Sequence, residues 1–99
     1  MNSGATSLII ASQNGSFAVV RELLARGANV NAATNDGSTP LIRASSHGHV
    51  EVVRALLAAG ADKRFMENNG ATATSLAGTY ATAPPGSRAA ILALLATAP

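Results

Sequence analysis

Two stretches of the chain carry nearly the same sequence: VVRELLARGAN at residues 19–29 and VVRALLAAGAD at residues 52–62. Each residue of the first stretch lies 33 positions before its counterpart in the second. The same interval separates Leu8 from Leu41, so the similarity extends beyond the two quoted segments. A period of about 33 residues indicates a helical solenoid, in which each unit buries its apolar side against the next one.

The residues before the second stretch predict a short helix. Thr39 is suited to the N-cap, and Pro40 is suited to the first helical position, where the backbone needs no N–H donor. We expect this helix to run to about His47 and to end at Gly48.

The second stretch itself predicts another helix, from about residue 51 to residue 59. Its Val and Leu residues recur with helical spacing and form one apolar stripe. Gly60 follows and can adopt the left-handed conformation that ends many helices. Residues 61–70 lose the helical periodicity and contain Asn-Asn-Gly, which is typical of a turn. Each unit is therefore expected to form a helix, a tight turn, a second helix and a hairpin-like loop.

The last third of the chain departs from this pattern. Thr72 is expected to cap a helix, and Tyr80 is expected on the exposed face of that helix. An insertion of about five residues near 81–86, which contains Pro-Pro-Gly, interrupts the period. Ser87 is expected to cap the last helix, which repeats the apolar stripe.

Residues 36–62 resemble the ankyrin repeat. The hallmarks are Thr-Pro-Leu at the first helix, Gly-His before the second helix, and Leu-Leu followed by Gly-Ala. The resemblance implies a single all-α domain over residues 1–99, an ankyrin-type solenoid of three stacked helix-turn-helix repeats joined by hairpin-like loops. The implied repeats span about 3–35, 36–68 and 69–99, the last with the short insertion.

Several positions depart from the family pattern, among them Ser7 and Ala73 in place of Pro and Thr74 in place of Leu. The family usually places His after Thr-Pro-Leu, where this chain has Ile9, Ile42 and Ser75. The hydrogen bonds that this His makes between repeats are therefore expected to be absent or replaced by apolar packing. The terminal units look irregular, as capping units commonly do. Leu92 and the Ala-rich last helix are not very polar, however, so end-to-end self-association is the alternative to a monomer.

The composition favours helical packing and narrows the function classes. Hydrophobic residues make up 47% of the chain and only 3% are aromatic, so Ala, Leu, Val and Ile supply most of the core. The net charge is only +2, which favours neither nucleic acid nor a membrane as a partner. There is no Cys, no segment resembles a signal peptide, and no apolar run approaches the ~20 residues that span a bilayer. We expect a soluble intracellular protein, in the cytoplasm with the nucleus left open.

His47 and His49 flank Gly48 and are the residues most suited to a metal. Tetrahedral zinc needs three or four ligands, and no further His, Cys or acidic cluster follows them. The resemblance assigns His49 to helix capping and packing. We therefore expect no metal site.

Ser45, Ser46, His47 and Asp36 include the residue types of a hydrolytic triad. Catalysis would require a base within hydrogen-bond reach of a serine hydroxyl, together with an oxyanion hole. Ser45 falls on the buried side of its helix by comparison with Ser12. The glycines are scattered in turns and form no phosphate-binding loop. We expect no enzymatic activity and no cofactor.

Residues 63–66, Lys-Arg-Phe-Met, leave two interpretations open. The basic pair is too short for a nucleic-acid-binding stripe and is interpreted as loop charge in water, with a partner contact as the alternative. Phe65 and Met66 occupy positions that are alanines in the first unit. They are expected either to pack beneath the loop or to anchor a partner.

The resemblance implies a protein–protein interaction module that binds another protein, whose identity the sequence does not specify. The binding surface of such folds is the concave face of the first helices together with the loop tips. The alternative is a structural or assembly unit that self-associates through its exposed ends, or a fragment of a longer ankyrin array. Carried over position by position, the expected contact residues are Ile10, Gln13, Asn14, Asn35, Asp36, Ser38, Arg43, Ser46, His47, Phe65, Met66, Glu67 and Tyr80.

Overall fold

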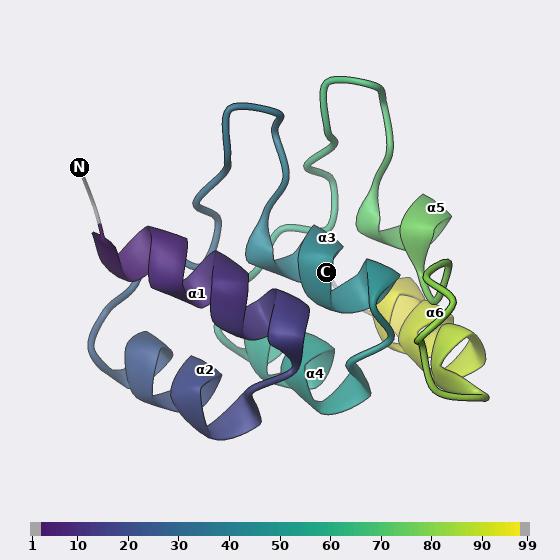
Figure 1. Ribbon diagram of the computed structural model, residues 1–99, viewed down its shortest axis with the longest axis horizontal. Helices are drawn as coiled ribbons and strands as arrows, with labels where there is room; N and C mark the ends of the chain where they lie inside the picture. Colours follow the sequence, from purple (N-terminus) through teal and green to yellow (C-terminus); the bar gives the residue numbers. More distant parts are fainter. Residues whose placement is uncertain (1–2, 98–99) are drawn as a thin grey trace.

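Helices follow one another in pairs along residues 3–97, the part of the chain that the computed structural model describes (Figure 1). Within that part no strand forms, and an isolated β-bridge joins Met66 to Thr72 across a loop. No helix in this range combines the length and apolar character needed to span a bilayer. The helices are α1 (Ser3–Asn14), α2 (Phe17–Ala25), α3 (Pro40–Ser46), α4 (Val50–Ala58), α5 (Ala73–Leu76) and α6 (Ser87–Thr97).

The pairs stack side by side in two layers. The first helices α1, α3 and α5 form one layer, and the second helices α2, α4 and α6 form the other (Figure 1). Each helix contacts both its pair partner and its neighbour in the same layer. The molecule is therefore a solenoid of three stacked helix-turn-helix units, as the 33-residue period predicts.

The unit that contains α3 and α4 begins and ends as its residues predict. The Thr39 hydroxyl accepts a hydrogen bond from the backbone N–H of Ile42 at 3.3 Å, and Pro40 occupies the first helical position. α3 ends before Gly48, which has a φ of 78°. α4 ends in the same way before Gly60, which has a φ of 95°. Both values lie in the left-handed region that glycine adopts without strain.

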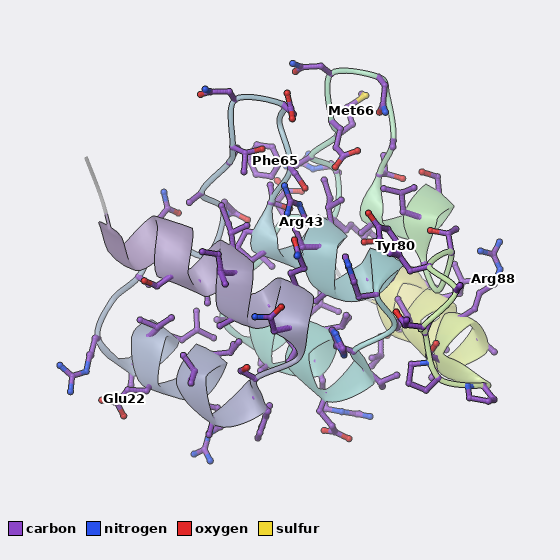
Figure 2. All side chains as sticks on the ribbon, in the orientation of Figure 1. Glu22, Arg43, Phe65, Met66, Tyr80 and Arg88 are labelled. Carbon is purple, nitrogen blue, oxygen red and sulfur yellow. The ribbon has the colours of Figure 1, made fainter. Side chains whose placement is uncertain are left out.

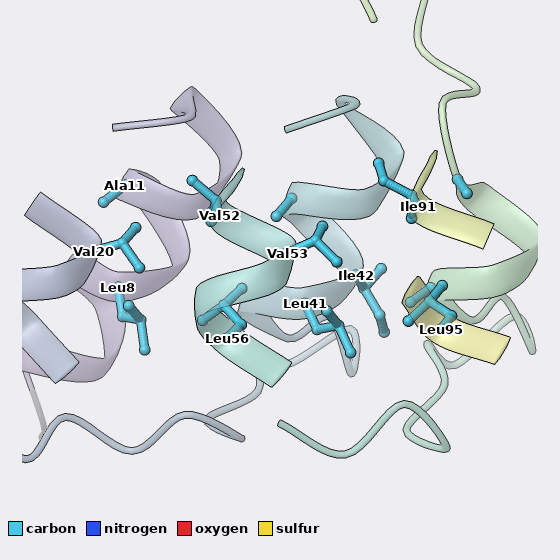
Figure 3. Close-up of a cluster of buried hydrophobic side chains, with 13 residues drawn as sticks. Leu8, Ala11, Val20, Leu41, Ile42, Val52, Val53, Leu56, Ile91 and Leu95 are labelled. Atoms are coloured by element: carbon cyan, nitrogen blue, oxygen red, sulfur yellow. The ribbon is translucent and has the colours of Figure 1, made fainter. Parts of the chain in front are cut away.

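One apolar cluster runs through all three helix pairs (Figure 3). Leu56 of α4 is fully buried in this cluster, and Leu23 of α2 and Leu94 of α6 pack against it. The expected contact between successive Val/Leu stripes is therefore confirmed. Val52 is only 1% exposed because α4 packs against α2, whereas its counterpart Val19 on α2 is 49% exposed. Burial of the stripe thus depends on the neighbouring pair and not on the helix itself.

The third pair differs from the sequence-based expectation. α5 covers only Ala73–Leu76, so Tyr80 lies beyond its end, and the prediction that Tyr80 sits on this helix was wrong. The backbone N–H of Gly78 donates to the Ser45 carbonyl at 2.8 Å, and that of Tyr80 donates to the Ser46 carbonyl at 3.1 Å. These hydrogen bonds to the neighbouring unit replace the bonds that would have continued the helix.

The start of α6 requires a smaller correction. The helix begins at Ser87 itself, and the Gly86 carbonyl accepts from the N–H of Ala90 at 3.2 Å. Gly86 therefore occupies the N-cap position, and Ser87 lies in the first turn. Thr72 caps α5 as expected, since its hydroxyl accepts from the N–H of Ser75 at 3.1 Å.

Ser45 carries a buried hydroxyl for which the described residues offer no hydrogen-bond partner, and so does its counterpart Ser12. Ser45→Ala is expected to raise the free energy of unfolding by about 1 kcal/mol, because it removes an unsatisfied polar group and improves helix propensity. Urea denaturation followed by circular dichroism measures the change. The control is Ser46→Ala on the same helix, since the Ser46 hydroxyl donates to the Arg43 carbonyl at 3.1 Å. An equal gain from both substitutions would contradict this explanation.

Candidate functional site

The residues expected to contact a partner do not all reach the surface. Two of them, Ser38 and Ser46, are buried, with 1% and 3% of their surface exposed. The others form what we call the candidate surface. Its half-buried members are Gln13, Arg43, His47 and Glu67, and its exposed members are Ile10, Asn14, Asn35, Asp36, Phe65, Met66 and Tyr80.

Arg43 of α3 is held in place by neighbours from two helix pairs. Its Nε donates to Ser38 Oγ at 2.8 Å, and its Nη1 donates to Gln13 Oε1 on α1. The Ser46 hydroxyl donates to the Arg43 carbonyl at 3.1 Å. Ser38 therefore orients the Arg43 guanidinium, whereas Ser46 bonds only to the backbone of its own helix, and the burial of both serines argues against their expected role as contact residues. A guanidinium that is already oriented loses little conformational entropy when a partner binds.

Both histidines donate hydrogen bonds to backbone carbonyls. His47 Nδ1 lies 2.9 Å from the Arg43 carbonyl, and His49 Nε2 lies 2.8 Å from the Gln13 carbonyl. Because a carbonyl oxygen only accepts, these two ring nitrogens carry protons. The His47 ring also stacks on Tyr80, with the ring centroids 3.9 Å apart. Over residues 3–97, no group of three or more His, Cys, Asp or Glu side chains could hold a metal ion.

The residue types of a hydrolytic triad are not arranged as one. Ser45 Oγ is buried and has no partner in the described structure. Ser46 Oγ lies 3.3 Å from His47 Nδ1, but that nitrogen donates to the Arg43 carbonyl and so cannot act as a base. No hydrogen bond between described groups joins Asp36 to the imidazole. The geometry therefore supports a structural role for these side chains.

The two hairpin loops meet near their tips and flank a hollow of about 270 Å³. The backbone N–H of Asn68 donates to the Asp36 carbonyl at 2.8 Å, and its Nδ2 donates to the Asn35 carbonyl at 3.2 Å. Sequence reasoning missed Asn68, although a step of 33 residues from Asn35 leads to it. The hollow is lined by Asp36, Ser38, Arg43, Glu67, Asn68 and Asn69.

Asp36 and Glu67 bring two carboxylates to this hollow. Among the described residues, neither of them forms an ion pair. The hollow thus combines an oriented guanidinium with two carboxylates and amide groups, which suits hydrogen bonding to a polar segment of a partner. The remaining acidic residues are paired: Glu22 with Arg26 at 2.6 Å, Glu51 with Arg54 at 3.6 Å, and Asp62 with Arg64 at 2.9 Å.

Phe65 and Met66 lie beside this polar hollow and remain exposed, by 42% and 58%. The alternative in which they pack beneath the loop is therefore wrong for these side chains. Figure 2 shows both residues at the second hairpin loop, with Arg43 below them on α3 and Tyr80 farther along the same side. Exposed apolar groups next to oriented polar ones are typical of a protein-binding surface.

The basic pair of the same loop is engaged with its own chain. The Arg64 guanidinium donates to the Asp62 carboxylate at 2.9 and 3.1 Å. Lys63 Nζ donates to the Leu95 carbonyl near the end of α6 at 2.7 Å, where a cation also interacts favourably with the helix dipole. The loop charges therefore support the local structure, and they form no basic stripe.

The Asp62–Arg64 pair predicts an acid-sensitive contribution to stability. Hydrogen bonds from Arg64 lower the pKa of Asp62 from its ordinary value of 3.8 to about 2. A carboxyl whose folded pKa is depressed stabilises the protein above its ordinary pKa, and this stabilisation is lost as the pH falls toward the folded value. The free energy of unfolding of the wild type is therefore expected to fall between about pH 4 and pH 2. That of the Asp62→Asn variant should fall less over the same window.

Urea titrations at several pH values in this window measure the slope for each variant. Arg64→Gln is the matched variant, because it removes the guanidinium but keeps the backbone N–H that donates to Asp62 Oδ1 at 2.8 Å, so it should flatten the same part of the pH profile only in part. If the free energy of unfolding of Asp62→Asn depends on pH as steeply as that of the wild type, another group controls the acid response.

Comparison with protein families identifies one match. The model described as "Ankyrin repeats (3 copies)" matches residues 1–67, which contain α1 to α4 and most of the second hairpin loop. The comparison with curated proteins finds no match. The third helix pair, with its shortened α5 and its proline-containing insertion, lies outside the matched residues.

Proposed function

The chain belongs to the ankyrin repeat family, and from this premise we propose that it binds a partner protein through the candidate surface. Ankyrin repeats are generally protein–protein interaction modules and are typically not enzymes. The proposal treats residues 1–99 as one domain whose repeats are divided near residues 35 and 68. It also retains the expected cytoplasmic setting, with a monomer that takes neither nucleic acid nor a membrane as its partner.

The single observation that carries the proposal is the fixed position of Arg43. Its guanidinium is held by Gln13 from one unit and by Ser38 from its own unit, and it lines the hollow between the hairpin tips. Exposed Phe65 on one side supplies an apolar group of the kind that anchors protein interfaces. The stacked helices would present these groups with little loss of conformational entropy on binding.

A triple variant tests this function. Arg43→Ala/Phe65→Ala/Tyr80→Ala removes three side chains of types that often dominate binding energy, so a specific partner should be captured at least ten-fold less. Affinity capture with quantitative mass spectrometry compares the triple variant with wild type. The control is Glu22→Ala/Arg26→Ala, an exposed ion pair on α2 and at its C-cap that lies outside the candidate surface. Equal recovery of every protein by wild type and triple variant would rule out this surface.

The second candidate function is assembly through the ends of the solenoid. The observation that favours it is the 49% exposure of Val19, at a position where the counterpart Val52 is covered by the neighbouring helix pair. Light scattering after size-exclusion chromatography distinguishes the two candidates. A mass that rises with concentration in wild type but not in Val19→Asp would support assembly, and a constant monomer mass would exclude it.

A further inference from the structure

A second hollow, of about 490 Å³, lies at the turns that join the helices of each pair. It is separate from the hairpin tips, which project from the other end of the first helices (Figure 1). Its volume falls in the range of small-molecule and peptide side-chain sites. The apolar part of its wall is formed by Phe17, Val50, Val52, Pro84, Pro85 and Ala90, so all three units contribute to it.

The insertion in the third unit explains why this hollow exists. Leu94 lies 38 positions after Leu56, and the same step leads from Val52 to Ala90. Ala90 therefore stands where the preceding unit has a valine, and its short side chain leaves space against α4. Pro84 and Pro85 also line that space, and their rings cannot fill it by changing rotamer.

The first turn of α4 brings unpaired donors to this wall. The first N–H groups of a helix have no acceptor within the helix. Thr39 and Thr72 satisfy such a group in α3 and α5, but the N-cap residue of α4, His49, makes no capping hydrogen bond. Its Nε2 donates instead to the Gln13 carbonyl at 2.8 Å. The first-turn N–H groups next to His49 and Val50 are therefore available at the edge of the hollow.

A hydroxyl on a largely buried residue supplies an independent polar group at the same place. Ser87 is only 4% exposed and lines the hollow. Within residues 3–97 its Oγ has no hydrogen-bond partner. It faces the turn between α3 and α4, since a Cβ on residue 48 would lie 2.6 Å from it. Unlike the fully enclosed hydroxyls of Ser12 and Ser45, this oxygen remains accessible from the hollow, so it can donate to a ligand that enters there.

We propose that this turn-side hollow binds an uncharged, apolar peptide segment, whose backbone carbonyl accepts hydrogen bonds from the first turn of α4 and from Ser87. The apolar wall would receive the bulky side chain next to that carbonyl. The charge at the edge of the hollow favours a neutral carbonyl over a carboxylate as the bound group. Glu51 also lines the hollow, whereas its partner Arg54, 3.6 Å away, does not, so the carboxylate would repel an anion at the helix N-terminus. The site is thus a second protein-binding position, independent of the candidate surface.

The test uses N-acetyl-L-phenylalaninamide, a neutral molecule with an aromatic side chain and two carbonyls, titrated into the full ¹⁵N-labelled chain. Backbone amide signals of Val50, Glu51, Val52 and Ser87 are expected to shift most and to follow one binding curve. N-acetyl-L-phenylalanine, which differs by its carboxylate, should bind more weakly to wild type. The difference in affinity between the two probes should be smaller for the Glu51→Gln variant than for the wild type.

Two variants and one control make the test specific. Ala90→Leu fills the hollow and should weaken binding at least ten-fold, whereas Ser87→Ala removes one donor and should weaken it about five-fold. Ala89→Leu adds the same volume to the same helix; Ala89 is exposed like Ala90 but does not line the hollow, so this variant should bind like wild type. Ser87→Ala is a small change, so it keeps the test valid if Ala90→Leu does not fold.

Three results would overturn the proposal. The absence of saturable shifts at the first turn of α4 would exclude the site. Unchanged binding by Ser87→Ala and Ala90→Leu would show that the probe binds elsewhere. Tighter binding of the carboxylate than of the amide would show that the site selects an anion, which contradicts the proposed class of ligand.

Discussion

Leu56→Ala is expected to lower the free energy of unfolding by about 3 to 4 kcal/mol, the usual range for emptying a well-packed leucine site. Leu56 has no exposed surface, and it lies in the cluster to which all three helix pairs contribute. Its stripe on α4 is buried between the neighbouring pairs, so the surrounding helices cannot close the cavity without shifting relative to one another. A loss of this size is a large part of the stability of a small domain.

Leu57→Ala is the matched control for this prediction. Leu57 is the next residue of the same helix, but it is only half-buried. Its removal exposes less apolar surface and leaves a site open to water, so a loss of about half that size is expected. Equal losses at the two positions, measured by urea denaturation, would contradict the claim that stacking of the pairs supplies most of the stability.

Gly48→Ala is expected to lower the free energy of unfolding by about 3 kcal/mol. Gly48 has a φ of 78°, where an alanine is strained. The added Cβ would also lie 2.6 Å from Ser87 Oγ, 2.8 Å from Ala83 Cβ and 2.9 Å from Pro84 Cδ. These atoms belong to the insertion and to the start of α6, so the substitution would push the third pair away from α3.

Gly60→Ala separates the two contributions to this effect. Gly60 has a φ of 95°, and a Cβ there would meet no atom within 4 Å. Only the backbone strain applies, so a loss of about 1 kcal/mol is expected. Thermal unfolding of both variants gives the comparison. If the two substitutions destabilise equally, the insertion does not pack against Gly48 as described.

The link between packing and function lies in the contacts across units. The position of Arg43 depends on Gln13, which belongs to the preceding helix pair. The position of Tyr80 depends on the hydrogen bond from its backbone N–H to the Ser46 carbonyl and on the stacking of its ring on His47. Any change that separates the pairs would therefore also disorder the candidate surface. In core variants, stability and partner binding should therefore decline together. In variants of the candidate surface, binding should decline without a matching loss of stability.

Part of the candidate surface could be predicted from the sequence. The 33-residue step correctly brought Arg43 to the first-helix layer and Asp36 to a hairpin tip. It did not reveal that Ser38 and Ser46 are buried, because a period specifies backbone register and not the direction of each side chain. It also did not single out Asn68, since one turn residue resembles another until its hydrogen bonds are known.

Local chemistry was sufficient to define the helix pairs and their stacking. Thr39, Pro40 and Gly48 act on their nearest neighbours in the chain, and a Val/Leu stripe on a short helix has to be covered wherever it occurs. Only the folded molecule decided how far α5 extends and where the turn-side hollow opens. Both depend on groups distant in the sequence: the Ser45 carbonyl competes for the Gly78 N–H, and the space beside Ala90 depends on how α4 lies against it.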